Sequence, residues 1–257
     1  MYELAGIHVR ADGPVRIVTL NRPDELNAFS ERLHAEFVHL WAHVDRDEDA
    51  RAVLLTGAGT AFSAGGSYDD FEHRRVDMAA RRRSLRLARQ LVDEMLAVAV
   101  PVVAAVNGPA VGLGCTVTTL CDIVFMADTA FLADTHVSVA LVAGDGGAVT
   151  WPAMTSLLRA KQYLLTGDRL YAADAVALGL ANFAVPADRL LDDALAYAHR
   201  LAAQPAQAVQ ETKAILYQHL RAHAVRALGY GLAAESQSHD TVDYAAAAER
   251  IKPKPAE

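Results

Sequence analysis

The chain has 257 residues, 53% of them hydrophobic and 21% charged, and its 31 acidic against 24 basic side chains leave a formal charge of −7. This apolar content can bury a sizeable core, which excludes disorder as the main state, and the length fits one large α/β domain or two small ones. The negative balance provides no general basic surface for phosphates, so nucleic acid is not an expected partner.

The N-terminal segment has no positively charged start followed by an apolar run, so no secretory signal is expected and the predicted location is cytoplasmic. Residues 95–121 contain no charged side chain, which by length alone would suggest a membrane span. Prolines, glycines and Asn107 interrupt this stretch, so it predicts a buried strand, a tight loop and a helix, and no membrane is expected. Cys115 and Cys121 would point in different directions from that helix and are interpreted as buried thiols.

The first predicted elements are a strand, an amphipathic helix and a second strand. Residues 17–20 and 53–56 are short β-branched runs, each ended by turn residues. Apolar residues recur at helical spacing over residues 33–44, and Ser30 is the expected N-cap of that helix. The alternation of strand and helix predicts a layered α/β domain.

The next predicted elements are two buried strands over residues 102–106 and 123–127, with a helix over residues 112–120 between them. After Trp151 the composition changes to alanine-rich segments with spaced leucines, so the C-terminal third is expected to be nearly all helix. The predicted helices there cover residues 172–180, 188–203 and 205–220. Residues 249–255 are expected to fray, because two prolines block a regular hydrogen-bond ladder.

Two glycine-rich turns, residues 61–67 and 107–115, each lead from a predicted strand toward a helix. Backbone amides at such a junction have no partner within the helix and lie at the positive end of its dipole. They can therefore bind an anion or stabilise a developing oxyanion. The alternative is that these glycines only permit tight turns.

Taken together, these turns and their surroundings resemble the crotonase (enoyl-CoA hydratase/isomerase) superfamily. The matching pieces occur in family order, and they are Leu20-Asn21-Arg22-Pro23 with Leu26-Asn27-Ala28, Phe62-Ser63-Ala64-Gly65-Gly66, residues 101–108, Cys121-Asp122-Ile123, residues 144–147, and Leu165-Thr166-Gly167-Asp168-Arg169. The resemblance implies an α/β crotonase-like fold of repeated ββα units, with C-terminal helices that support a homotrimer or a dimer of trimers. We expect residues 1–195 to form the core and residues 196–257 the C-terminal helical region.

The resemblance also implies an acyl-CoA thioester substrate and no separate cofactor. The backbone amides of Gly66 and Leu113 would hold the thioester oxygen and stabilise an enolate. Contacts to the adenine of coenzyme A would fall near Leu26, Ala28 and Ala64. The spacing of Cys, His and carboxylate residues suits no metal site, so no metal is expected.

The sequence departs from the superfamily at both glutamates with which its hydratases place water and move a proton. The aligned positions are Thr116, which can hold a water but cannot act as a base near neutral pH, and His136, which can act as a general base. Asp145 is the other candidate for the acid–base group, and its alternative is a structural role in a glycine-flanked turn.

Side chains after the first glycine turn are less clearly assigned. Ser67 and Tyr68 are candidates for the acyl pocket, as is Trp151. The arginine-dense segment is either a solvated helix face or the source of one or two contacts to coenzyme A phosphates. Its arginines are Arg74, Arg75, Arg81, Arg82, Arg83, Arg86 and Arg89.

The leading hypothesis for function is an enzyme that isomerises or hydrates an enoyl-CoA through an enolate held by backbone amides. Isomerisation needs only one acid–base group, whereas hydration would use Asp145 and His136 as a pair. Two alternatives stay open. One is a hydrolase of the same superfamily that cleaves a carbon–carbon bond in a β-diketone, and the other is a catalytically weak acyl-CoA binding protein.

Overall fold

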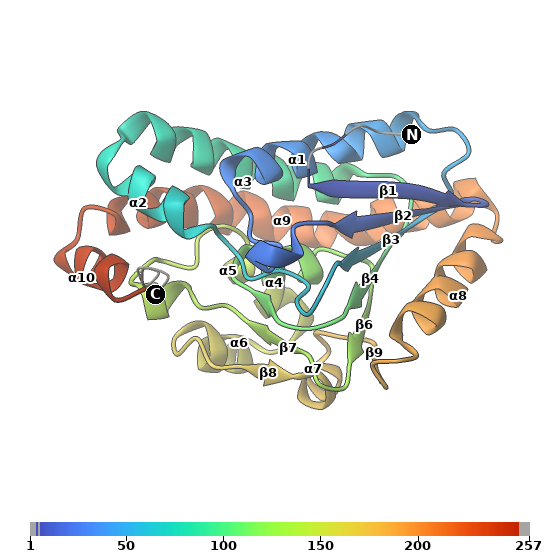
Figure 1. Ribbon diagram of the computed structural model, residues 1–257. Coiled ribbons are helices and arrows are strands. Elements are labelled where there is room, and N and C mark those ends of the chain that lie inside the picture. The colour runs from blue at the N-terminus through green and yellow to red at the C-terminus, as the bar shows by residue number, and fades with distance from the viewer. Residues whose placement is uncertain (1–3, 5, 252–257) are drawn as a thin grey trace.

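A six-stranded sheet runs through the protein in the order β1-β2-β3-β4-β6-β9, as seen in the computed structural model, which describes residue 4 and residues 6–251 (Figure 1). β1 pairs with β2 in antiparallel orientation, and every other neighbouring pair in this sheet is parallel. The strands are β1 (Ile7–Asp12), β2 (Val15–Leu20), β3 (Ala52–Gly57), β4 (Val102–Val106), β6 (Ile123–Ala127) and β9 (Phe183–Val185). The protein therefore has the α/β architecture predicted from its sequence.

A smaller three-stranded sheet lies beside the first, in the order β5-β7-β8. β5 pairs with β7 in parallel, and β7 pairs with β8 in antiparallel orientation. These strands are β5 (Ala110–Val111), β7 (Phe131–Ala133) and β8 (Leu170–Tyr171). β5 and β7 directly precede segments that form the cavity described below.

Helices cover the sheets. α8 packs on β3 and β4, while α1 packs on α3, and α9 contacts both α3 and α5 (Figure 1). The α-helices are α1 (Glu31–Arg46), α2 (Tyr68–Val76), α3 (Met78–Ala97), α4 (Leu113–Thr119), α5 (Gly147–Met154), α6 (Leu157–Leu164), α7 (Ala172–Leu178), α8 (Leu190–Ala202), α9 (Ala206–Ser238) and α10 (Val242–Ile251). Short 3-10 helices are η1 (Pro23–Glu25) and η2 (His136–Val139).

The predicted central elements are confirmed. β4 and β6 have the bounds expected from the sequence, and every residue of β3 and β4 is buried, as is usual for parallel strands covered on both faces. The side chain of Ser30 accepts a hydrogen bond from the Leu33 amide and caps α1 as predicted. Cys115 and Cys121 are both buried free thiols, and burial raises the pKa of each.

Other boundaries differ from the prediction. Two short strands, β8 and β9, interrupt the C-terminal third, and α9 extends well beyond residue 220 because its buried apolar face continues through Leu228 and Leu232. Residues 249–251 belong to α10, while residues 252–255 lie outside the described residues. The domain boundary expected after residue 195 falls within α8.

Parallel strands bring the two glycine turns to the same edge of the large sheet. β3 ends at Gly57 just before the first turn, and its neighbour β4 ends at Val106 just before the second. Loops that follow adjacent parallel strands meet at their carboxyl ends, which is the usual position of a site in an α/β sheet. None of the described helices is long and apolar enough to cross a membrane.

Candidate active site

The two glycine turns lie against one another. Ser63 and Ala110 form a parallel bridge, in which the Val111 amide donates to the Ser63 carbonyl at 2.9 Å. Gly65 has φ +89°, and a Cβ at this position would lie 2.7 Å from the Val111 carbonyl oxygen, so only glycine fits the approach. Among the hydrogen bonds of the described residues, none uses the backbone N–H of Gly66 or of Leu113.

Hydrogen bonds of Asn27 stabilise the first glycine turn. The side-chain Nδ2 of Asn27 donates to the carbonyls of Ala58 and Ala61 at 2.8 and 2.9 Å. The backbone carbonyl of Asn27 accepts from Ser63 Oγ at 2.8 Å. Leu26, the residue before it, has φ 50° and Asn27 has φ 55°, a strained conformation for residues with a side chain.

The residues expected near adenine lie at this turn. The Ala64 amide donates to the Leu26 carbonyl at 2.9 Å, which joins two of them directly. Leu26 is half exposed, and Ala28 lies two residues further along the segment that follows η1. The backbone therefore gathers Leu26, Ala28 and Ala64 at one edge of the first glycine turn.

A cavity of about 160 Å³ lies between the two glycine turns. Gly66, Leu113, His136 and Asp145 of the predicted site line it. Ala64 lines it too, whereas Thr116 reaches it only through a hydrogen bond to Asp145. Four further polar side chains line this cavity from distant helices, and they are His34 of α1, Arg74 of α2, Ser84 of α3 and Glu235 of α9.

A chain of buried polar groups runs along one side of the cavity. Thr116 Oγ1 donates to Asp145 Oδ1 at 3.0 Å, and Asp145 Oδ2 lies 3.3 Å from His136 Nε2. The other ring nitrogen, His136 Nδ1, bonds Asp134 Oδ1 at 2.6 Å. Asp134 follows β7 directly, so the strand positions the whole chain. Asp134 was not singled out from the sequence, although it lies two residues before His136.

Burial and charge act in opposite directions on these groups. Burial alone would lower the pKa of His136, but the carboxylates of Asp145 and Asp134 outweigh it and hold that pKa well above its usual range. Burial would raise the pKa of Asp145, but the charge of His136 and the hydrogen bonds from His136 and Thr116 lower it. At neutral pH the pair is therefore an imidazolium beside a carboxylate.

Glu235 is a cavity residue that the sequence analysis missed. It is only 7% exposed, and its Oε2 has no hydrogen-bond partner among the described residues. Burial, followed by the charge of Asp145, raises the pKa of Glu235 to about 7. A signal did exist, because Glu235 continues the buried face of Leu228 and Leu232 at helical spacing, and an acid on such a face is uncommon.

Comparison with known proteins identifies the family of this chain. The model of the enoyl-CoA hydratase/isomerase family matches residues 10–253. The chain belongs to the enoyl-CoA hydratase/isomerase family. A 1,2-epoxyphenylacetyl-CoA isomerase of Escherichia coli (strain K12) is 35% identical over 196 residues, which cover 74% of this chain and 74% of that one.

Solved structures of the family share the whole architecture. The structure of an enoyl-CoA hydratase/isomerase from Mycobacterium paratuberculosis has a TM-score of 0.94 at 47% identity and covers 97% of this chain and 100% of that chain. A β-diketone hydrolase from the cyanobacterium Anabaena, bound to (S)-3-oxocyclohexyl acetic acid, has a TM-score of 0.83 at 28% identity. That match covers 92% of this chain and 94% of that one. The crotonase-like fold predicted from the sequence is thus confirmed.

Several candidates for the acyl pocket of this enoyl-CoA hydratase/isomerase family member lie elsewhere. Trp151 is fully buried in α5 and packs on Tyr163, and it does not line the cavity. Ser67 and Tyr68 start α2 and are also absent from the cavity wall. Among the described residues, no group of three or more His, Cys, Asp or Glu side chains has an arrangement that could hold a metal ion.

The arginine-dense segment is not a uniformly solvated face. It forms the end of α2 and much of α3, and two of its arginines point inward. Arg74 lines the cavity, and Arg81 is buried and pairs with Asp240 at 2.8 Å. By contrast, Arg75 pairs with Glu72 at the surface, and Arg83 pairs with Glu31. The interpretation as a solvated face is therefore wrong for Arg74 and Arg81.

Proposed function

We propose that this family member isomerises an enoyl-CoA by moving a proton through an enolate. The observation that carries the proposal is that the backbone amides of Gly66 and Leu113, which have no hydrogen-bond partner among the described residues, line the same cavity as the Asp145 carboxylate. Amides fixed before the reaction stabilise charge as it develops on the thioester oxygen, and removing one such donor typically costs about 10²- to 10³-fold in kcat.

In the proposed reaction, the Asp145 carboxylate removes a proton from C2 of a 3-enoyl thioester. The C–H electrons first form the C1–C2 double bond of the enolate. When the thioester carbonyl re-forms, these electrons shift to a C2–C3 double bond, and the electrons of the original C3–C4 double bond take up the same proton at C4. In the intermediate the negative charge is on the thioester oxygen, at the amides. One acid–base group is sufficient, and no oxidant or cofactor is consumed.

His136 would serve this reaction by holding and tuning Asp145. Its imidazolium keeps Asp145 ionised and therefore ready to accept a proton, while Asp134 fixes the orientation of the ring. Thr116 donates a second hydrogen bond to the same carboxylate. Leu26, Ala28 and Ala64 would hold the adenine end of coenzyme A through main-chain atoms, as the resemblance implies.

Leu113 offers a direct test of the amide pair. It is the first residue of α4, where proline is tolerated because that position has no intrahelical hydrogen bond to lose. Leu113→Pro removes the proposed donor, and we expect kcat to fall about 10²- to 10³-fold with acyl-CoA binding retained. Leu113→Ala keeps the amide and is the matched control. Equal activity of the two variants would contradict the proposed role of this amide.

A second candidate is cleavage of a carbon–carbon bond in a β-diketone by water. It is favoured by one observation, which is that the carboxyl groups of Asp145 and Glu235 line one cavity. There the charge of His136 lowers the pKa of Asp145 against the effect of burial, and burial raises the pKa of Glu235 to about 7. Two carboxyl groups whose pKa values differ in this way can provide a base for water and an acid for the departing carbon. Calorimetric titration with coenzyme A distinguishes the candidates, since tight binding contradicts a substrate that lacks it.

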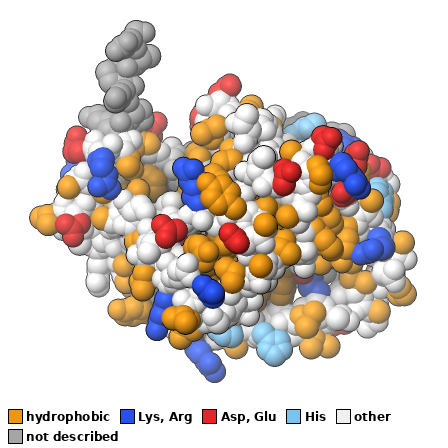
Figure 2. Space-filling model, turned by 90° about the horizontal axis from the view of Figure 1, so that it is seen from below, with side chains coloured by type: hydrophobic (Ala, Val, Ile, Leu, Met, Phe, Trp, Pro, Cys, Tyr) orange, Lys and Arg blue, Asp and Glu red, His pale blue; other side chains and the backbone are white. Residues whose placement is uncertain are grey.

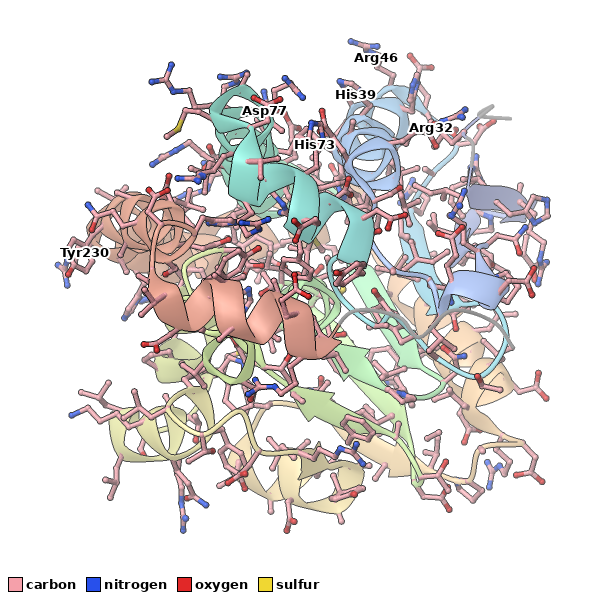
Figure 3. The ribbon with its side chains drawn as sticks, turned by 60° about the vertical axis from the view of Figure 1, so that its left-hand side comes forward. Arg32, His39, Arg46, His73, Asp77 and Tyr230 are labelled. Atoms are coloured by element: carbon pink, nitrogen blue, oxygen red, sulfur yellow. The ribbon has the colours of Figure 1, made fainter. Side chains whose placement is uncertain are left out.

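We also infer assembly as a homotrimer or a dimer of trimers. Hydrophobic side chains lie among the charged ones on the face seen from below in Figure 2, and Leu157, Leu158 and Leu165 are exposed on and just after α6. On α9, Val225 and Tyr230 are strongly exposed, and Tyr230 points away from the body of the protein in Figure 3. Exposed apolar side chains in such numbers support a subunit interface. Sedimentation at equilibrium would test this, and a monomer would contradict it.

A further inference from the structure

Arg74 is a fixed cation at the wall of the cavity. Its Nε donates to the Asp70 carbonyl at 2.9 Å, its Nη1 donates to Ser84 Oγ at 2.6 Å, and its guanidinium carbon lies 5.0 Å from the centre of the Phe71 ring. These contacts leave Nη2 with no hydrogen-bond partner among the described residues. A guanidinium held in this way loses little freedom when it binds a further anion.

The free end of Arg74 lies beside the first glycine turn. Its Nη2 is 3.6 Å from the point where a Cβ on Gly66 would be. Arg74 forms none of the ion pairs found in the part of the chain that the structure describes. Of the nearby acids, Glu31 pairs with Arg83 and Asp70 accepts from the Glu31 amide at 2.6 Å, whereas Glu235 lines the same cavity and its Oε2 has no partner among the described residues.

His34 is a second polar side chain at the same wall, and its ring also has a hydrogen bond with the Leu87 backbone. It is buried, and its Nε2 has no hydrogen-bond partner among the described residues. Burial, followed by the charge of Arg74, lowers the pKa of His34 to about 4. The ring is therefore neutral at physiological pH, and in one tautomer its Nε2–H can donate a single hydrogen bond.

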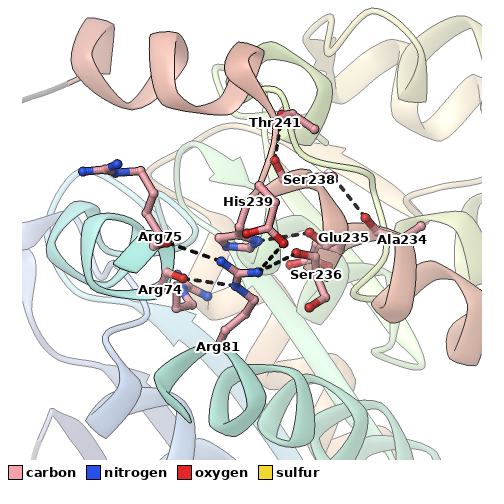
Figure 4. Close-up of polar contacts among 10 residues, drawn as sticks. Arg74, Arg75, Arg81, Ala234, Glu235, Ser236, Ser238, His239 and Thr241 are labelled. Carbon is pink, nitrogen blue, oxygen red and sulfur yellow. Dashed lines mark hydrogen bonds and ion pairs between the residues drawn. The ribbon is translucent and has the colours of Figure 1, made fainter. Parts of the chain in front are cut away.

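Arg74 and His34 share the wall of the cavity with Asp145, His136 and Glu235. They also line an adjoining space of about 20 Å³, together with Glu31 and Asp70. Buried Arg81 holds this region in place by donating to the carbonyls of Arg74, at 3.2 Å, and Ser236, at 3.3 Å (Figure 4). The backbone of Arg74 is thus tied to the end of α9, which carries Glu235.

We propose that Arg74 and His34 form a carboxylate subsite, and that the preferred substrate is a short acyl thioester whose acyl chain ends in a carboxylate. This inference rests on the proposed action on acyl-CoA. A charged N–H of the Arg74 guanidinium and a neutral N–H of His34 together match the two oxygens of a carboxylate. The phosphates of coenzyme A are a less suitable ligand, because the pantetheine arm separates them from the thioester carbonyl, which would lie at Gly66 beside Arg74.

Equilibrium binding of two saturated ligands tests the subsite without requiring turnover. Glutaryl-CoA and pentanoyl-CoA have acyl chains of the same length that end in a carboxylate and in a methyl group. We expect the wild-type protein to bind glutaryl-CoA more tightly in calorimetric titration. Arg74→Gln should weaken glutaryl-CoA binding by about 10- to 100-fold and leave pentanoyl-CoA binding within about threefold.

Three further variants make the result specific. Arg74→Lys keeps the charge and should recover part of the glutaryl-CoA affinity, and His34→Gln should weaken glutaryl-CoA binding by about 3- to 10-fold. Arg75→Gln changes the neighbouring surface arginine and should affect neither ligand. Thermal melting of each variant separates a loss of the subsite from a loss of folding.

Other outcomes overturn the proposal in distinguishable ways. Equal weakening of both ligands by Arg74→Gln would mean that Arg74 contacts coenzyme A or only supports the wall. Equal or tighter binding of pentanoyl-CoA by the wild-type protein would contradict the carboxylate subsite while leaving the proposed function intact. Failure of the wild-type protein to bind either ligand would contradict the proposed function itself, and this inference with it.

Discussion

The two glycine turns and the long helix α9 contribute to one cavity in different ways. The turns provide backbone amides, whose positions follow from strand pairing and from a glycine that no other residue can replace. α9 provides one side chain, Glu235, from a helix far away in the sequence. The backbone part of the site is thus encoded locally, whereas the side-chain part depends on how distant helices pack.

The largest effect is expected at Asp145, which lines the cavity together with both glycine turns and Glu235 of α9. Asp145→Asn keeps the shape of the side chain and its place beside Thr116 but cannot accept the proton. We expect kcat to fall by about 10²- to 10⁴-fold, with acyl-CoA binding retained in calorimetric titration. Asp168→Asn, at an exposed acid, is the control. Activity within a few-fold of wild type would remove Asp145 from the reaction.

A pH-dependent effect on stability is expected at Glu235, the contribution of α9. Its pKa is raised by burial to about 7, so the folded state binds a proton that the unfolded state releases above about pH 4.5. Stability should therefore fall as pH rises from about 4.5 through 7. Glu235→Gln removes this penalty and should stabilise the protein at pH 8 by an amount on the order of 3 kcal/mol, with little change at pH 4.5. Urea unfolding at both pH values measures it, and an equal effect at each would show that Glu235 does not titrate in this range.

An effect smaller than that at Glu235, and of opposite sign, is expected at Gly65 in the first glycine turn. Gly65→Ala puts a Cβ 2.7 Å from the Val111 carbonyl oxygen in a backbone conformation with φ +89°. We expect about 1–3 kcal/mol of destabilisation in urea unfolding, together with loss of activity as the two turns separate. Gly13 also has a positive φ, but a Cβ there would meet only His199 Cε1, at 4.0 Å, so Gly13→Ala is the control for strain without the clash.

The smallest effect is expected at Ser30, which caps α1 and does not line the cavity. Ser30→Ala removes the hydrogen bond accepted from the Leu33 amide and should cost about 1 kcal/mol in urea unfolding. Catalysis should be unchanged if local capping matters only for folding. A large loss of activity would show that the position of α1, which carries His34, also controls the cavity.

Much of the fold was predictable because it follows from local patterns. The buried strands β3, β4 and β6, the cap at Ser30 and the two turns all have signals within a few residues. The very short strands β5, β8 and β9 have none, since two or three residues cannot show a period. Their pairing is set by contacts between distant segments.

The residues of the site were predicted only in part. The resemblance located Gly66, Leu113, His136 and Asp145, and the structure places all of them around one cavity. The resemblance did not point to Asp134, to Glu235 or to the inward direction of Arg74. Whether an arginine of α2 faces solvent or the cavity depends on the angle at which α2 meets α3, and no local pattern reports that angle.

The most direct test of the proposed function is incubation with a 3-enoyl-CoA in deuterated water, followed by mass spectrometry and NMR of the acyl product. We predict a 2-enoyl-CoA in which the double bond has moved, with deuterium at C4 when Asp145 exchanges its proton with solvent, and no added water. Addition of water across the double bond would instead show hydration, and an unchanged substrate would contradict isomerisation.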